Sequence, residues 1–288
     1  MNVLEIKGVS YSYSKNTPFE IKALDNVNLS VEKGSLTAII GHTGSGKSTL
    51  IKMFNALLTP DSGEILLDSD DINKDKQTQH DVRFKVGLCF QYPEYQLFEE
   101  TVYKDIAYGP KNMKLTESEI DSRIRNIASF VGITPDMLKK SPFDLSGGEK
   151  RRVAIAGVMA MQPEVLVLDE PAAGLDPRGK NTILKLIKDY RIKTGATVII
   201  VSHSMEDVAD IATDIVVMNK GSVALHGDAD EVFSHAQELV EMGLNVPCVT
   251  NIMLSLKKAG YDVNTNIYTI ESAREELCRF VKERGTLL

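Results

Sequence analysis

The sequence of 288 residues contains no tryptophan, only three cysteines and no apolar run long enough to cross a bilayer. Cys89, Cys248 and Cys278 are odd in number and include no Cys-x-x-Cys pair, so they offer no disulfide framework and favour a reducing, cytosolic location. The longest apolar runs, at 165–168 and 198–201, have the length of strands, whereas a membrane span needs about 20 residues. Residues 1–7 do not have the composition of a signal peptide.

A surplus of positive charge is also missing. The formal net charge is −7 and the isoelectric point is near 5.4, which argues against a surface that wraps nucleic acid. We therefore expect no nucleic-acid partner. The hydrophobic fraction of 43% and the charged fraction of 25% are ordinary for a soluble globular chain, whose length allows one large domain or two.

Strand patterns alternate with helical patterns through most of the chain. Strands are predicted over 3–14, 29–40, 63–68, 86–90, 165–169, 197–201 and 214–218, and helices over 117–131, 178–192 and 204–211. The alternation predicts a parallel sheet with helical crossovers, and the helical stretch from about 100 to 160 predicts a subdomain set on that sheet. Beyond residue 228, helices are predicted over 230–242, 250–259 and 272–282.

Residues 41–49 match the phosphate-binding pattern G-x-x-x-x-G-K-[ST] and lie between a strand pattern and a helical pattern, the context that this loop requires. Its glycines allow backbone N–H groups to turn toward phosphate, and the following helix directs its positive end there. The residues expected to bind the nucleotide are Gly41, His42, Thr43, Gly44, Ser45, Gly46, Lys47, Ser48 and Thr49. An ordinary glycine-rich turn capped by serine is the alternative, and it leaves the lysine at the required offset unexplained.

Two carboxylates end the apolar strand at 165–169. Asp169 is expected at the C-terminal edge of the sheet, where open α/β sheets collect ligands, and could hold Mg²⁺ opposite the Ser48 hydroxyl. Lys47 would add positive charge near the β- and γ-phosphates. Glu170 points elsewhere and is the candidate acceptor of a proton from attacking water. Two solvated acids at a strand end are the alternative interpretation.

Two further polar residues follow neighbouring strands. His203 comes after the strand at 197–201 and is expected to contact the γ-phosphate, although a lone histidine is more often structural or solvated. Gln91 follows the strand at 86–90 and is expected to bind Mg²⁺ or to orient water.

A second candidate anion site begins the helical pattern at 150–161. Ser146 is a good N-cap, and Gly147 and Gly148 expose helix-end N–H groups. Ser-Gly-Gly alone is most often a capped loop, but here it stands shortly before the strand that ends in Asp169. Two phosphate-binding helix ends and one nucleotide loop in a chain suggest that two chains share two nucleotides.

Together these motifs resemble those of the ATP-binding cassette (ABC) ATPases, over residues 1 to about 228. The resemblance implies Walker A at 41–49, the Q-loop at Gln91, the signature at 145–149, Walker B at 165–170 and the switch histidine at His203. It also implies ATP and Mg²⁺ as cofactors and a D-loop with Asp176, which contacts ATP across the dimer together with Ser146, Gly147 and Gly148. Tyr13 matches the aromatic residue that stacks on adenine, with Tyr11 as the competing choice and a half-buried strand tyrosine as the alternative.

Residues 91–102, 151–157 and 169–177 are more narrowly similar to the second ATPase subunit of energy-coupling factor transporters, the prokaryotic importers of vitamins and transition metals. The resemblance implies a second ABC ATPase subunit (a paralogue or the chain itself), an integral membrane coupling subunit and a separate substrate-binding membrane subunit as partners. It also implies a peripheral place on the cytoplasmic side of the cell membrane. Residues 229–288 would form a dimerisation or regulatory region.

The expected fold is α/β: a P-loop NTPase core with an antiparallel β subdomain, an inserted helical subdomain at about 95–160, and a small C-terminal helical region.

The sequence departs from the family pattern at Glu149, where the family has glutamine. We expect the Glu149 side chain to face away from the phosphates because a carboxylate would repel them. Competing interpretations are a conventional importer or exporter, a soluble ABC protein of repair or translation, and a non-catalytic scaffold. The intact Glu170 and His203 argue against the scaffold.

Overall fold

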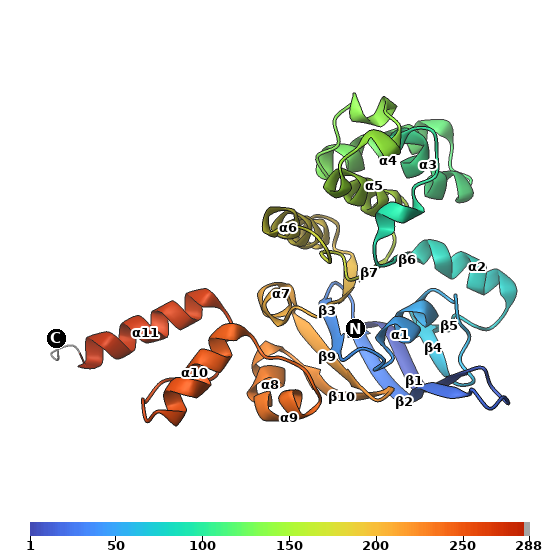
Figure 1. Ribbon diagram of the computed structural model, residues 1–288. Coiled ribbons are helices and arrows are strands. Elements are labelled where there is room, and N and C mark those ends of the chain that lie inside the picture. Colours follow the sequence, from blue (N-terminus) through green and yellow to red (C-terminus); the bar gives the residue numbers. More distant parts are fainter. Residues whose placement is uncertain (285–288) are drawn as a thin grey trace.

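The computed structural model describes residues 1–284 and centres on a six-stranded sheet of order β10-β9-β3-β8-β7-β6 (Figure 1). Its strands are β3 (Leu36–Gly41), β6 (Val86–Cys89), β7 (Val165–Asp169), β8 (Thr197–Val201), β9 (Asp214–Asn219) and β10 (Ser222–Gly227). All neighbours pair in parallel except β10, which runs antiparallel to β9. Strands β3, β7 and β8 are buried at every position, as their continuous apolar runs require when helices cover both faces.

A second, antiparallel sheet of order β2-β1-β4-β5 is formed by β1 (Asn2–Tyr13), β2 (Ile21–Glu32), β4 (Ser62–Leu67) and β5 (Asp70–Asp71). Helix α1 (Lys47–Phe54) lies between the two sheets, with Leu50 and Phe54 in a core shared with both. The predicted single strand at 29–40 is wrong. Gly34, with φ +75°, turns the chain between β2 and β3, which belong to different sheets.

The opposite face of the main sheet is covered by α6 (Pro177–Thr194) and α7 (Met205–Ile211). A helical subdomain is inserted between β6 and β7 (Figure 1). Its elements are η1 (Pro93–Gln96), α3 (Val102–Asn112), α4 (Glu117–Phe130), η2 (Met137–Lys139), η3 (Pro142–Asp144) and α5 (Gly147–Met159). The α/β class with an antiparallel sheet and inserted helices is therefore confirmed. Helix α2 (Lys76–Lys85), with Val82 as its buried residue, was not predicted.

Four helices follow β10: α8 (Ala229–Ser234), α9 (Ala236–Glu241), α10 (Cys248–Lys258) and α11 (Ile270–Arg284). The predicted helix at 230–242 is broken at His235, and Phe233 of α8 is buried in the main core. Helices α10 and α11 instead form a small core of their own around Met253 and Ile267. None of the described helices is long and apolar enough to span a bilayer.

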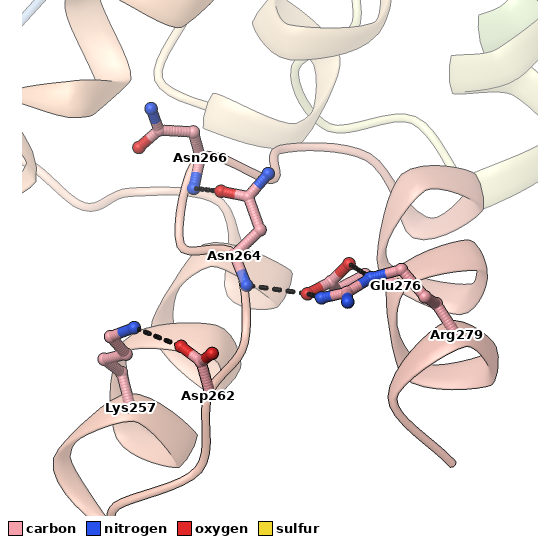
Figure 2. A network of polar contacts seen from close by, with 6 residues as sticks. All are labelled: Lys257, Asp262, Asn264, Asn266, Glu276 and Arg279. Carbon is pink, nitrogen blue, oxygen red and sulfur yellow. Dashed lines mark hydrogen bonds and ion pairs between the residues drawn. The ribbon is translucent and has the colours of Figure 1, made fainter. Parts of the chain in front are cut away.

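A polar network fixes the loop between α10 and α11 (Figure 2). The N–H of Asn264 donates to Glu276 Oε1 at 2.7 Å, and Arg279 Nη2 donates to the same oxygen at 2.7 Å. The Arg279 and Asn264 hydrogen bonds lower the pKa of Glu276 to about 2. Lys257 pairs with Asp262 at 2.9 Å on the other side of the loop.

Candidate active site

The loop between β3 and α1 has a backbone conformation that requires glycine. Gly44 has φ +83° and Gly46 has φ +104°, the left-handed region that glycine favours. A Cβ on Gly46 would lie 2.6 Å from the carbonyl oxygen of Ala23, whereas one on Gly44 would meet nothing within 4 Å. The Ser45 hydroxyl is buried there without a hydrogen-bond partner in the described structure. The loop therefore requires glycine at position 46, has open space over Gly44 and contains a buried hydroxyl without a partner.

Lys47, the first residue of α1, is buried beneath this loop with 6% of its surface exposed. Its Nζ donates to the carbonyl oxygens of Gly41 at 2.7 Å and His42 at 3.0 Å. Burial lowers the pKa of Lys47, while the nearby Glu170 and Asp169 raise it. These contacts place a cation between the loop and the two carboxylates.

Asp169 ends β7 and is buried, and the Ser48 side chain lies near its carboxylate. Burial raises the pKa of Asp169, and Ser48 and Lys47 oppose that rise. The structure thus brings together the hydroxyl and the carboxylate that the sequence assigned to Mg²⁺. Gln91 lies beyond the end of β6 with an exposed side chain.

The Glu170 side chain points in a different direction from that of Asp169 because the Glu170 backbone is left-handed, with φ +49°. Its N–H donates to Val201 of β8 at 3.0 Å, which fixes the residue at the sheet edge. Its Oε1 lies 3.2 Å from His203 Nε2, but the geometry is not that of a hydrogen bond, so this buried oxygen has no donor among the described residues. Burial, with the charge of Asp169, raises the pKa of Glu170 to about 7.

His203 is exposed at the end of β8. Burial lowers the pKa of its ring, and the Lys47 charge lowers it further. A neutral imidazole at neutral pH can donate one N–H and accept at the other nitrogen. Glu170 and His203 therefore form a pair that can hold a water molecule or a phosphate oxygen through hydrogen bonds.

The Tyr13 hydroxyl is 3.2 Å from Thr49 Oγ1 of α1. Tyr11 packs edge-on against the Tyr13 ring at 5.0 Å. Tyr13 thus contacts the helix that follows the loop, and Tyr11 packs against the Tyr13 ring. Its own ring remains 37% exposed.

The Ser-Gly-Gly segment begins α5 in the helical subdomain, well separated from α1 (Figure 1). Ser146 is exposed, and a Cβ on Gly147 or Gly148 would meet nothing within 4 Å. Asp176 caps α6 by accepting from the N–H of Gly179 at 2.7 Å. The start of α5 thus lies away from the loop of its own chain, and the role of these residues toward a second chain stays a prediction.

Glu149 points back toward the start of α5. Its Oε2 accepts from the Ser146 N–H at 2.8 Å and from the Ser146 hydroxyl at 2.7 Å, completing a capping box. These hydrogen bonds lower the pKa of Glu149. The carboxylate is favourable here because it satisfies helix-end donors, and it already engages the hydroxyl that was expected to meet ATP.

We expect Glu149→Gln to change the ATP turnover rate by less than about threefold, since an amide oxygen can accept both bonds from Ser146. Glu149→Ala removes the acceptor and should lower the free energy of unfolding by about 0.5–2 kcal/mol. Steady-state phosphate release and thermal melting would measure the two effects. A large rise in rate or ATP affinity for Glu149→Gln would instead place the carboxylate close enough to repel the phosphates.

One ion pair, between a buried arginine and a partly buried glutamate, was not predicted from the sequence. Arg151 of α5 pairs with Glu94 of η1 at 2.6 Å. The two residues are 57 positions apart, so no local pattern connects them. The only signal for this pair in the sequence was two adjacent arginines shortly after the Ser-Gly-Gly segment.

Comparisons with known proteins agree with this geometry. The family model described as ABC transporter matches residues 24–173. The chain is similar to the energy-coupling factor transporter ATP-binding protein EcfA2 of Clostridium tetani, with 52% identity over 98% of this chain and 99% of that one. It is also 52% identical to EcfA2 of Clostridium acetobutylicum, over 97% of this chain and 98% of that one.

Solved structures show the same likeness. CbiO1 from Clostridium perfringens, described as part of the ABC transporter complex cbiONQ, has a TM-score of 0.75 and 39% identity, covering 90% of this chain and 97% of that one. The ATP-binding cassette MJ0796, solved as a dimer bound to ADP and Pi, has a TM-score of 0.70 and 28% identity. That match covers 78% of this chain and 98% of the MJ0796 chain.

Proposed function

This chain belongs to the ABC transporter family, and within it to the energy-coupling factor transporter ATP-binding proteins, and from this premise we propose that it hydrolyses ATP to drive uptake of a vitamin or transition metal across the cell membrane. The observation that carries the proposal is the Glu170 carboxylate, buried beside Asp169 with one oxygen lacking a hydrogen-bond donor in the described structure. A binding-only scaffold has no use for such a base.

The ATP phosphates would be held by the loop at 41–46 and by Lys47, with Thr49 in the first turn of α1. The open space over Gly44 and the unpartnered Ser45 hydroxyl fit an anion in the loop. On binding, Lys47 would exchange its loop carbonyls for phosphate oxygens. Tyr13, which contacts Thr49, would stack on the adenine.

Mg²⁺ fits the donors at the sheet edge. The Ser48 hydroxyl, the Asp169 carboxylate and the Gln91 amide are all oxygen ligands of the kind that Mg²⁺ prefers. When bound, the ion would neutralise phosphate charge as a Lewis acid. The closeness of the Ser48 side chain to the Asp169 carboxylate supports the assignment because it brings two of the three donors together.

Glu170 would accept the proton of the attacking water, and His203 would hold the γ-phosphate at the same edge. Their 3.2 Å separation supports a shared target. Ser146, Gly147, Gly148 and Asp176 of a second chain would complete the site, since both helix ends are open to the surface. The dimeric state of the similar MJ0796 cassette supports this arrangement.

The pH dependence of ATP hydrolysis should report Glu170. Its pKa is raised to about 7, and only the ionised form can accept a proton, so kcat/KM should fall about tenfold per pH unit below pH 7 and level off above it. Phosphate release measured between pH 5.5 and 9 would give the profile. A flat profile across pH 7 would contradict the assignment.

The chain would work as a peripheral subunit on the cytoplasmic side of the membrane. Its partners would be a second ATPase, an integral coupling subunit and a substrate-binding membrane subunit, as expected for an energy-coupling factor transporter ATP-binding protein. The segment after β6 is suited to docking because Tyr95 and Phe98 are 85% and 60% exposed.

Phosphate release by the purified assembly, measured with Mg²⁺ and then with excess EDTA, tests the proposed ATPase function. Turnover no higher than that of Glu170→Gln would contradict it.

The C-terminal helices would hold the two ATPases together. A groove of about 560 Å³ between α10 and α11 is almost wholly apolar, and Ile252, Ile270 and Val281 on its walls are 47%, 74% and 64% exposed. Residues 229–247 belong instead with the cassette, because Val232 and Phe233 are buried in the main core. Residue 228 therefore marks the end of the sequence motifs, but the chain beyond it still packs into the core of the cassette.

We expect a chain ending at Pro247 to bind ATP with unchanged affinity but to lose its nucleotide-free association with the second ATPase. In the full-length chain, Ile270→Glu should weaken that association by tenfold or more, whereas Ile192→Glu, on exposed α6, should not. Sedimentation with and without ATP measures both. An unchanged nucleotide-free dimer in either altered chain would contradict the role.

A further inference from the structure

Arg151 is the largest fully buried side chain of the described structure, with 1% of its surface exposed. Its Nε and Nη2 donate to the two carboxylate oxygens of Glu94 at 2.9 and 2.6 Å. Its Nη1 donates to the carbonyl oxygens of Pro171 at 3.2 Å and Ala173 at 2.5 Å. One guanidinium group thus makes four hydrogen bonds, in directions that no other side chain can supply together.

Arg151 and its partners lie on three segments, which are η1, α5 and the turn after β7. Glu94 belongs to η1, in the segment proposed to face the membrane partner, and Arg151 lies in α5, one turn after Ser146. Pro171 directly follows Glu170, and Ala173 closes a turn by donating its N–H to the Glu170 carbonyl at 3.1 Å. Arg151 therefore holds the turn that carries the proposed base.

A second contact joins the same segments. The Tyr92 ring lies 5.6 Å from the Arg151 guanidinium carbon, and a Cβ on Gly174 would come within 3.4 Å of that ring. The segment after β6 is therefore joined to the segment after β7 through Arg151, and the Tyr92 ring lies beside Gly174. A displacement of either segment must move or break these contacts.

Stability alone does not account for this arrangement. Burying an ion pair costs desolvation energy, and apolar side chains of similar volume often stabilise a fold as well or better. What the pair adds is a fixed relative position for three segments, because the forked guanidinium accepts only one geometry.

We propose that Arg151 is a positioning residue that transmits movement of the segment at 92–96 to the turn at Glu170. The inference rests on the proposed ATPase function. A membrane partner that displaces η1 would shift Glu94, and through Arg151 the shift would reach Pro171, Ala173 and the adjoining Asp176. Arg151 itself contacts neither ATP nor water in this account.

The kinetic test compares Arg151→Lys and Glu94→Gln with a matched control, Arg125→Lys, which alters an exposed Arg–Asp pair on α4. In the purified transport assembly, Arg151→Lys should lower kcat by tenfold or more and leave KM for ATP within threefold. Glu94→Gln, which keeps the side-chain shape, should lower kcat less, and Arg125→Lys should leave it unchanged. A purely structural role would lower the amount of folded protein and leave kcat per folded molecule unchanged.

Because the sequence contains no tryptophan, the fluorescence of one introduced tryptophan can report directly on the segment at 92–96. Tyr95→Trp places a single fluorophore on η1 at a residue that is 85% exposed. In the full-length chain, ATP should change its emission, and adding Arg151→Lys or Glu94→Gln should reduce that change by half or more while ATP affinity stays within threefold.

Wild-type kcat and an undiminished fluorescence change in both altered chains would overturn the proposal. The two readouts also separate it from the proposed function. If the unmodified assembly hydrolyses no ATP, the function fails, but the fluorescence change depends on ATP binding alone and still decides the role of Arg151. If Arg151→Lys does not fold, Glu94→Gln carries both readouts, because its side chain is partly exposed.

Discussion

Replacing Glu170 with glutamine is expected to lower kcat for ATP hydrolysis by about 100- to 10,000-fold while ATP affinity stays within about threefold. Glutamine fills the same space at the end of β7 but cannot accept a proton. The buried position, the pKa near 7 and the unpartnered Oε1 all point to the carboxylate as the chemical group. Single-turnover phosphate release, with separate titration of ATP, distinguishes the chemical step from binding.

Glu164→Gln is the matched control, since this glutamate stands just before the other end of β7 and pairs with Lys85 at 3.8 Å. It should leave turnover unchanged. If Glu170→Gln also retains turnover within a few-fold of the unmodified chain, Glu170 is not the base.

Lys47→Ala should weaken ATP binding itself, by about 10- to 150-fold, the range expected for one charge-assisted hydrogen bond of about 1.5–3 kcal/mol. The ammonium group already lies under the loop, bonded to the carbonyls of Gly41 and His42. Equilibrium titration with a fluorescent ATP analogue measures the effect.

Lys52→Ala removes a lysine from the last turn of the same helix and should not change ATP affinity. Thermal melting of Lys47→Ala would show whether the loop survives the loss of its internal bonds. Unchanged ATP affinity in a folded Lys47→Ala chain would remove Lys47 from the phosphate site.

The sequence predicted the parts of the site that depend on short spacing. The loop at 41–49 and the carboxylates after β7 are local patterns, and the rule that parallel strands end at one sheet edge was enough to expect Asp169 near Ser48. Family membership, the fold class, the ATPase activity and the partner types are likewise confirmed by the comparisons. The individual roles of the site residues stay predictions.

What the sequence did not reveal depends on distant contacts or on the direction of one side chain. The pair of Glu94 and Arg151 spans 57 residues and forms only when the helical subdomain packs against the sheet. The break at Gly34 was missed because only three residues separate β2 from β3, and the residues on both sides of it have a strand pattern. Glu149 caps the start of α5, and that its side chain faces away from the phosphates of a bound nucleotide stays a prediction.

In the C-terminal region too, the local structure was predicted from the sequence but the packing was not. Helical periodicity predicted its helices, but periodicity does not say which core a helix joins. The structure assigns Phe233 to the cassette core and Met253 to a separate one. The apolar groove between α10 and α11 follows from that separation.

The central claim is that this chain is the ATP-hydrolysing subunit of a membrane transporter assembled with a second ATPase. Affinity purification of the tagged full-length chain from detergent-solubilised membranes, with partners identified by mass and phosphate release measured on the same sample, tests it most directly. We predict recovery of a second ATPase chain and of small integral membrane proteins, with Mg²⁺-dependent turnover that Glu170→Gln abolishes. Recovery of the chain without any membrane protein, or turnover that survives Glu170→Gln, would contradict the account.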